Sequence, residues 1–145
     1  MIKPNTVYEI FDQVQKAATQ EERIQVLKDN NCLAIRDVLR ASFDDTIVFT
    51  LPAGDPPYKD SLSKEGMSPT NLIRSTNRFT YFVKGGLGDQ LKAVKRETMF
   101  LALLEGIHPL DAKIVCAMKD KKLQELYPAL SKELTKAVWP KLILS

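Results

Sequence analysis

The chain is poor in the side chains that carry most nucleophilic and metal chemistry. Its 145 residues include one histidine, two cysteines and one tryptophan. A Ser–His–Asp triad needs an imidazole, and a zinc site needs several Cys or His ligands at short spacings. His108 directly precedes Pro109 at an expected helix start, which favours a capping or packing role. We therefore expect no enzyme, no metal site and no cofactor.

The two cysteines, Cys32 and Cys116, lie beside apolar residues and form no CxxC pair. Buried free thiols are the preferred interpretation, and a reducing compartment fits them better than secretion. The first residues lack the continuous apolar region of a secretory signal. The longest apolar run, Met99 to Leu104, is far shorter than the roughly 20 residues that span a bilayer. We expect a soluble intracellular protein without membrane contact.

Acidic pairs and a glycine run offer other chemistry. Glu21-Glu22 and Asp44-Asp45 have the oxygen ligands that magnesium prefers. The first pair, however, suits the first turn of a helix, and the second suits a turn. The run Lys84-Gly85-Gly86-Leu87-Gly88-Asp89 precedes an expected helix but matches neither phosphate-binding fingerprint. We interpret it as a flexible link, and a carboxylate–metal enzyme is the least favoured hypothesis.

Length and composition predict one folded domain, residues 1–145. The chain is 44% hydrophobic and 27% charged, outside the regime of disordered chains. We expect a mainly α (α+β) protein, a compact bundle of about six short helices with a small two-stranded β element and a long Pro-rich loop in the middle. Helical parts at 1–43 and 90–145 would flank a strand and loop region at 44–89.

Helical spacing marks the first part of the chain. Apolar residues recur at i, i+3, i+4 and i+7 after Thr6, and Thr19 with Glu22 forms a capping box for a second helix. Asn30-Asn31 ends that helix, and a third apolar face follows. The apolar positions are Val7, Ile10, Phe11, Val14, Ile24, Val26, Leu27, Leu33, Ile35, Val38 and Leu39.

The middle of the chain follows another pattern. Ile47, Phe49 and Leu51 recur at every second position, which predicts a strand. Residues 79–83 form a second extended run that we expect to pair with it. Residues 52–69 are rich in proline and poor in large apolar side chains, which predicts a long loop.

Three further helices are expected. Residues 90–105 carry Leu91, Val94, Met99, Phe100, Leu103 and Leu104 at helical spacing, and we expect them to form the central core helix. Pro109 suits the first position of the next helix, with Leu110, Ile114, Val115 and Met118 inward and basic residues at its end, in 119–122. A last short helix starts at Ser131 and ends at Pro140.

Positive charge is concentrated in one region. Residues 74–96 hold six basic side chains against Asp89 alone, a net of +5, whereas the whole chain has +3. Interleaved aromatic rings suit a groove that follows phosphates and stacks bases, and an acidic protein suits the same region. The alternative is that the rings face the core beside an ordinary solvated face. The candidate binding residues are Arg74, Arg78, Phe79, Tyr81, Lys84, Lys92, Lys95 and Arg96.

The C-terminal tail is a second candidate binding segment. Trp139, Leu142, Ile143 and Leu144 come at or after the end of the last expected helix. Such apolar tails usually dock on their own domain, but an exposed one would anchor a partner or a second copy of the chain.

Most of the chain resembles a family of small uncharacterised proteins of T-even-type tailed phages, including those of marine cyanobacteria. The resemblance rests on the segments NTVYEIFDQVQKA, AIRDVLRASFDDTI with LPAGDPPY, RFTYFVKGG and LLEGIHPLDA. The family has no established activity, so the resemblance assigns no site residues. It implies a location in the cytoplasm of an infected bacterium, with the virion as the alternative.

These observations favour a non-enzymatic phage accessory protein in nucleic-acid metabolism, acting in replication, recombination or transcription through residues 74–96. The alternative is a protein-interaction module that uses the 52–69 loop and the tail. Its partner would be a host factor, a virion component or a second copy of the chain. Candidate partners are therefore a phage or host protein and nucleic acid.

Overall fold

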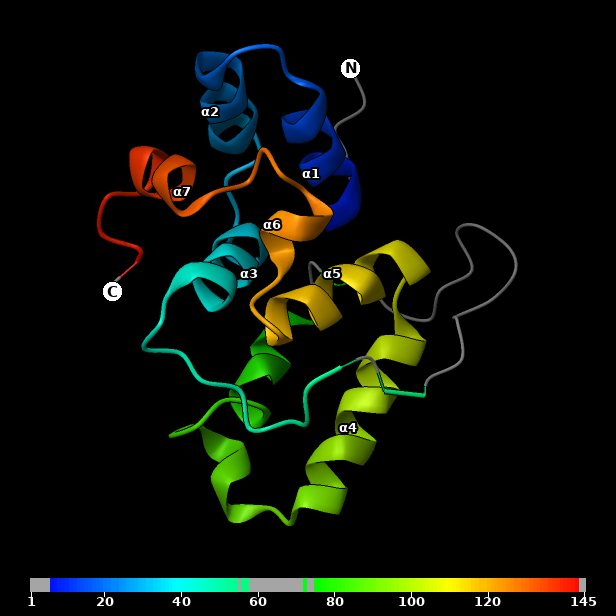
Figure 1. Cartoon of the computed structure of the whole chain (residues 1–145). Coiled ribbons are helices and arrows are strands. Elements are labelled where there is room, and N and C mark those ends of the chain that lie inside the picture. Colours follow the sequence, from blue (N-terminus) through cyan, green and yellow to red (C-terminus); the bar gives the residue numbers. More distant parts are fainter. Residues whose placement is uncertain (1–5, 55, 58–71, 73–74, 144–145) are drawn as a thin grey trace.

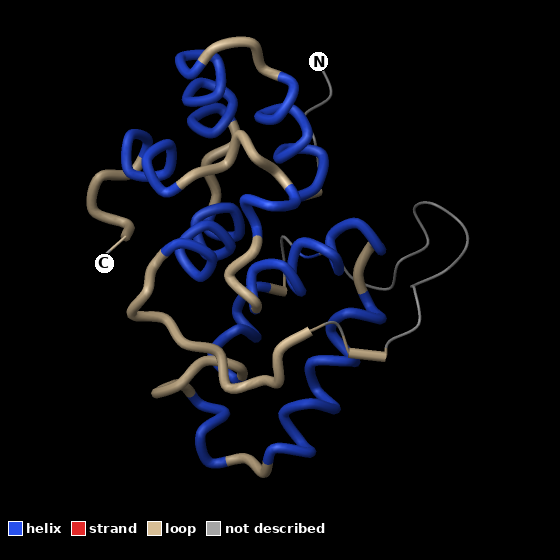
Figure 2. Tube along the Cα trace, in the orientation of Figure 1, coloured by secondary structure: helices blue, strands red, loops and turns tan. Residues whose placement is uncertain are grey.

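A computed structural model describes residues 6–54, 56–57, 72 and 75–143. Arg74, Leu144 and most of the predicted 52–69 loop lie outside these residues. Figure 1 shows the helices and Figure 2 their connecting loops; the described residues form no strand. The elements are α1 (Val7–Lys16), α2 (Gln20–Asp29), α3 (Leu33–Phe43), the 3-10 helices η2 (Thr76–Tyr81) and η3 (Leu87–Gln90), α4 (Ala93–Gly106), α5 (Pro109–Lys119), α6 (Leu123–Leu126) and α7 (Lys132–Val138).

The three predicted N-terminal helices are confirmed, and local side chains begin two of them. The Thr6 hydroxyl accepts the Glu9 amide of α1, and the Thr19 hydroxyl accepts the Glu22 amide of α2 at 3.2 Å. The predicted stripe of α1 is buried, and α2 packs against both α1 and α7. Leu33 was expected in the third apolar face but is 63% exposed, because it occupies the first position of α3.

The central helix is α5, which contacts α1, α3, α4 and α6. The prediction that residues 90–105 form the central helix is therefore wrong, although α4 does bury Phe100, Leu103 and Leu104. Val94 was expected inward but is 74% exposed, because the first turn of α4 extends beyond the core at the lower end of the molecule (Figure 1). None of the helices in the described ranges has the length and apolar character of a membrane span.

The predicted two-stranded β element is not formed by the described residues. Only a single antiparallel bridge joins the two segments, with Phe49 opposite Val83. The Thr50 amide donates to the Phe82 carbonyl at 2.8 Å, and the Lys84 amide donates to the Val48 carbonyl at 2.7 Å. The pairing of the segments was thus anticipated, but residues 76–81 coil into η2 and leave too little extended chain for a sheet.

The glycine run explains why this region coils. A Cβ atom at Gly88 would lie 1.8 Å from the Tyr81 carbonyl oxygen, and one at Gly86 would lie 2.1 Å from the Thr80 carbonyl oxygen. Only glycine allows two backbones to approach this closely. The prediction of a flexible link is therefore wrong: the run packs η3 directly against η2.

The C-terminus of α5 ends in a turn that normally contains glycine. The Lys122 amide donates to Ala117 O and the Lys121 amide to Met118 O, the two bonds of a Schellman turn. Lys121 occupies the left-handed position with a φ of 60°. Its ammonium group donates to the carbonyls of Ala41 and Asp44 at the end of α3, 5.7 Å from the Phe49 ring centroid. The side chain therefore caps a second helix, which glycine could not do.

The N-terminus of α5 holds α1. His108 Nδ1 accepts a hydrogen bond from the Leu110 amide, and the imidazole stacks on the Tyr8 ring with 4.5 Å between the ring centroids. Both contacts confirm the predicted structural role of His108. The Asp111 carboxylate accepts the Tyr8 amide at 2.9 Å and is 1% exposed. Desolvation raises the pKa of Asp111 to about 6, against the lowering effect of that hydrogen bond.

We predict that Lys121→Ala is more destabilising than Lys121→Gly. Both variants lose the bonds to the end of α3, at a cost of about 2 kcal/mol, but glycine removes the left-handed strain and should recover about 1 kcal/mol. Urea unfolding of the two variants and the wild type measures the difference. Equal stabilities would contradict a strained turn, and wild-type stability in Lys121→Ala would contradict the cap.

We predict a pH-dependent contribution from Asp111. Because burial raises the folded-state pKa of this acid, its contribution is fully present below about pH 4 and is lost as the pH rises to about 6. The loss amounts to about 2–3 kcal/mol of the unfolding free energy by pH 7. Asp111→Asn keeps the acceptor for Tyr8 and should remove this dependence, whereas Glu125→Gln, at an exposed residue, should retain it. Unfolding curves between pH 4 and 7 test this, and identical pH profiles in all three proteins would refute it.

Candidate functional site

The cations of the predicted binding region lie in a lobe at the lower end of Figure 1, which we call the basic lobe, residues 75–96. Arg78, Lys84, Lys92 and Lys95 are exposed there. Within the described residues, none of these four side chains forms an ion pair or a side-chain hydrogen bond. The one carboxylate of the lobe, Asp89, accepts the Gly85 amide at 2.7 Å. The positive charge of the lobe is therefore not neutralised internally.

The aromatic rings of the region are not presented for base stacking. Phe79 is 7% exposed and Phe82 is 1% exposed, the latter with its ring edge-to-face on Phe100 at 5.2 Å. Tyr81 is half-buried and packs against the core. The alternative interpretation of the sequence, in which the rings face the core, describes this structure. Bases could stack on Phe79 or Phe82 only if the lobe opened.

Arg96 and the glycine-run amides are also engaged internally. The Arg96 guanidinium donates to the carbonyls of Gly88 at 3.1 Å and Leu91 at 2.7 Å, which joins η3 to α4. The Gly86 amide donates to Val83 O, and the Leu87 amide donates to Thr80 Oγ1 at 3.2 Å. These amides are thus used within the fold and are not available to hold a phosphate.

Two exposed apolar side chains accompany the cations. Leu87 is 65% exposed and Val94 is 74% exposed, the highest fractions among the large hydrophobic residues of the described ranges. Sequence reasoning missed both, because Val94 follows the helical spacing of a buried position and Leu87 stands inside the glycine run. The basic lobe therefore combines unpaired positive charge with exposed apolar area.

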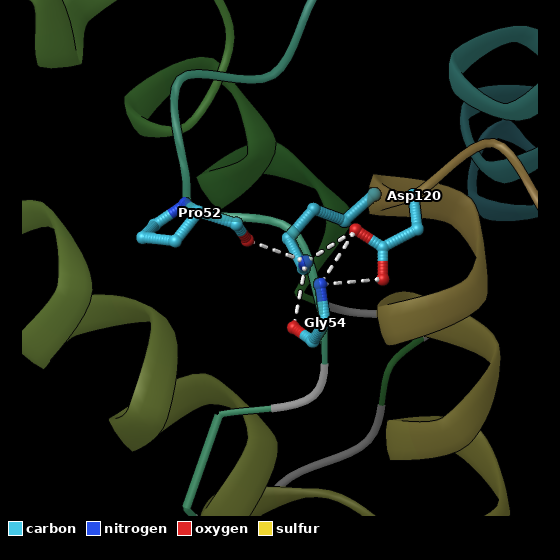
Figure 3. Close-up of polar contacts among 4 residues, drawn as sticks. Pro52, Gly54 and Asp120 are labelled. Carbon is cyan, nitrogen blue, oxygen red and sulfur yellow. Dashed lines mark hydrogen bonds and ion pairs between the residues drawn. The ribbon is translucent and has the colours of Figure 1, made fainter.

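A second site lies where α5 meets the segment after the β-bridge. The Lys119 ammonium donates to Pro52 O at 2.8 Å, Gly54 O at 3.0 Å and Asp120 Oδ1 at 2.6 Å. The Asp120 carboxylate in turn accepts the Gly54 amide at 3.1 Å, and Figure 3 shows these bonds converging. The Lys119 side chain is 2% exposed. We call this arrangement the lysine clasp: Lys119, Asp120, Pro52 and Gly54.

The lysine clasp holds one wall of a cavity of about 340 Å³. That wall consists of residues 51–54 with Pro56 and Pro57, and α4 supplies Glu97, Phe100 and Leu101 opposite. Little in the amino-acid pattern pointed to this site. The basic residues 119–122 were assigned to the dipole of their own helix, whereas Lys119 and Lys121 bind carbonyls of other segments.

The C-terminal tail lies against its own domain. Ile143 is 6% exposed, and Trp139 is half-buried against the core. Leu142 and Trp139 line an open hollow of about 390 Å³ together with Arg36. Two of the four predicted tail residues are thus largely used in packing the domain, and the described tail is not a free extension.

The acidic pairs do not form a shared site. Asp44 is fully buried and accepts the Thr46 amide and hydroxyl, whereas the Asp45 side chain is 83% exposed and lies 3.7 Å from Lys132 Nζ. Across the described residues, no three His, Cys, Asp or Glu side chains are placed to hold a metal ion. Cys32 and Cys116 are both reduced thiols, and Cys116 is buried.

A family model matches residues 10–125 of the chain; its description is "Family of unknown function (DUF6433)". The chain belongs to this family. The matched range of this DUF6433 protein includes the basic lobe and the lysine clasp, and it stops before α7 and the tail. No curated protein matches the chain.

We predict that Lys119→Met releases the 52–54 segment. The change leaves two carbonyls without their donor and Asp120 without its cation, which should lower the unfolding free energy by about 2 kcal/mol. Hydrogen exchange of the Gly54 amide should accelerate at least about tenfold. Lys122→Met is the matched control, because Lys122 is exposed, and exchange at Gly54 should remain unchanged. Unaltered exchange in Lys119→Met would show that the clasp does not hold this segment.

Proposed function

We propose that this DUF6433 protein is a non-enzymatic binding module that recognises an acidic partner protein through the basic lobe. The observation that carries the proposal is the exposure of Leu87 and Val94 among four unpaired cations. Apolar side chains at the centre of an interface contribute most of its affinity, and surrounding charges steer the partner and fix its orientation. A partner surface with carboxylates around an apolar residue would complement this lobe.

Nucleic acid is the second candidate, because four unpaired cations in 22 residues would also attract phosphates. Two observations favour protein over nucleic acid. The phenylalanine rings that would stack on bases are buried, and the aliphatic side chains of Leu87 and Val94 are 65% and 74% exposed. An aliphatic side chain contributes little to phosphate binding but is easily matched by a protein surface.

The context that we propose is the cytoplasm of a bacterium infected by a tailed phage, with the protein acting as an accessory factor on phage or host machinery. This part of the proposal rests on the resemblance of its segments to proteins of T-even-type phages. The partner that we propose is then a component of replication, recombination or transcription. A virion component is the alternative partner.

We predict that two classes of variant separate the candidates. Leu87→Ser/Val94→Ser should abolish capture of the partner from infected cells while leaving the fold intact, and Lys84→Glu/Lys95→Glu should abolish it as well. Lys16→Glu/Lys28→Glu is the matched control on α1 and α2, at the opposite end of the molecule (Figure 1), and should capture the same partner as the wild type. Quantitative mass spectrometry of crosslinked captures measures the amount of partner bound by each variant relative to the wild type.

Fluorescence anisotropy with single- and double-stranded DNA and RNA tests the nucleic-acid candidate. If four cations contact phosphates, the logarithm of the affinity should fall with the logarithm of salt with a slope of about −3 to −4. Tight binding with that slope, unaffected by Leu87→Ser/Val94→Ser, would overturn the protein proposal in favour of nucleic acid. Equal capture by the wild type and both lobe variants would overturn it as well.

A further inference from the structure

We infer that the cavity beside the lysine clasp binds a small organic cation, an ammonium or guanidinium group attached to an apolar body. The cavity uses none of the residues on which the proposed lobe function depends, so the inference is independent of it. It follows from the charge, the size and the rigidity of the cavity walls.

The walls are mostly apolar, with two charged residues among them. The apolar surface comes from Leu51, Pro52, Pro56, Pro57, Phe100 and Leu101, and the charge comes from Glu97 and Lys119. Apolar walls with a few polar groups are the usual composition of small-molecule sites. The body of the ligand should therefore be apolar. The charge of its polar group should be opposite to that of whichever residue, Glu97 or Lys119, is not already paired within the protein.

The available charge is negative. An ammonium group has three donors, and those of Lys119 are directed at Pro52 O, Gly54 O and Asp120 Oδ1. Asp120 neutralises the lysine at 2.6 Å. Glu97, by contrast, has no ion pair or hydrogen bond within the described residues. A carboxylate ligand would meet an unpaired carboxylate and no free donor from Lys119, whereas a cationic ligand would neutralise Glu97.

The volume limits the ligand to a small molecule. About 340 Å³ lies at the lower end of the range for ligand pockets. At about 30 Å³ per water-sized unit, this space corresponds to roughly a dozen non-hydrogen atoms. One aromatic ring or a short branched chain, with an amine one or two carbons away, has this size. The Phe100 ring in the wall would favour an aromatic body.

The lysine clasp explains how an exposed loop can act as a fixed wall. Pro52 and Gly54 are exposed residues without regular structure, and their backbone groups are held by four hydrogen bonds to Lys119 and Asp120. Figure 3 shows the Asp120 carboxylate beside the Gly54 backbone. Prolines at 52, 56 and 57 restrict the wall further. A wall that is fixed before binding loses little conformational entropy when a ligand enters.

Three probes of one shape test the inference by NMR titration of amide shifts in the full-length protein: phenethylammonium, uncharged 2-phenylethanol and anionic 3-phenylpropionate. Phenethylammonium should shift the amides of Gly54, Leu101 and Lys119 in a saturable manner. Its affinity should exceed that of the alcohol by about fivefold, as expected for a partly exposed ion pair. The anion should bind more weakly than the alcohol.

Variants distinguish the contribution of the Glu97 charge to binding from that of the cavity itself. Glu97→Gln should bring the ammonium and alcohol affinities within about twofold of each other while leaving the alcohol affinity unchanged. Leu101→Trp should fill the cavity and abolish binding of both the ammonium and the alcohol. An unchanged far-UV circular dichroism spectrum is the control for folding. Glu133→Gln, at an exposed carboxylate on α7, is the matched control and should retain the fivefold preference.

Three results would overturn the inference: no saturable shifts around the cavity, anion affinity equal to that of the ammonium, or a preference that survives Glu97→Gln. Binding of the alcohol and the ammonium with equal affinity in the wild type would overturn it too, because the site would then be an apolar hole without charge selection. None of these results depends on capture by the basic lobe, so this inference and the proposed function fail separately.

Discussion

Two lysines at the C-terminal end of α5 hold both ends of residues 44–54, which follow α3 and have no regular structure. Lys121 donates to the carbonyls of Ala41 and Asp44, and Lys119 donates to those of Pro52 and Gly54. Backbone carbonyls in a segment without regular structure need partners, because an unsatisfied buried polar group costs free energy. The ammonium groups supply these partners from a helix that is itself packed on four neighbours.

The position of the basic lobe depends on this segment. With its ends held, the segment presents Phe49 to Val83 in the single bridge, and the hydrogen bonds on either side attach the lobe to the rest of the chain. The lobe is then closed by backbone packing at Gly86 and Gly88 and by the Arg96 guanidinium. These internal contacts do not use the side chains of Arg78, Lys84, Lys92 and Lys95, which remain exposed and available to an external partner.

The two proposed sites differ in the sign of the charge that each leaves available. In the basic lobe the cations outnumber the single carboxylate Asp89, so the available charge is positive. Among the described residues that line the cavity, Lys119 is the only cation and is neutralised by Asp120, so Glu97 determines the charge that the cavity presents. Helix α4 contributes to both sites: its first residues belong to the basic lobe, and Glu97, Phe100 and Leu101 line the cavity.

Sequence alone determined the parts of the fold that depend on local interactions. Thr6, Thr19 and Ser131 cap their own helices, Pro109 begins α5, and the apolar stripe of α1 is buried as its spacing predicts. Each of these features depends on one residue or on residues within two turns of the same helix. The charge excess of residues 74–96 is likewise a property of composition, so it depends on no contact between distant segments.

Tertiary structure decided the rest, because the groups involved are distant in sequence. Residues 76–81 form η2 and not a strand, because the glycine run packs directly on them, and Val94 is exposed because the first turn of α4 extends beyond the core. Lys119 and Gly54 are 65 residues apart, and Lys121 and Ala41 are 80 apart. The local sequence shows which side chains a segment contains. The partner of a long charged side chain is determined only when packing of the core brings distant segments together.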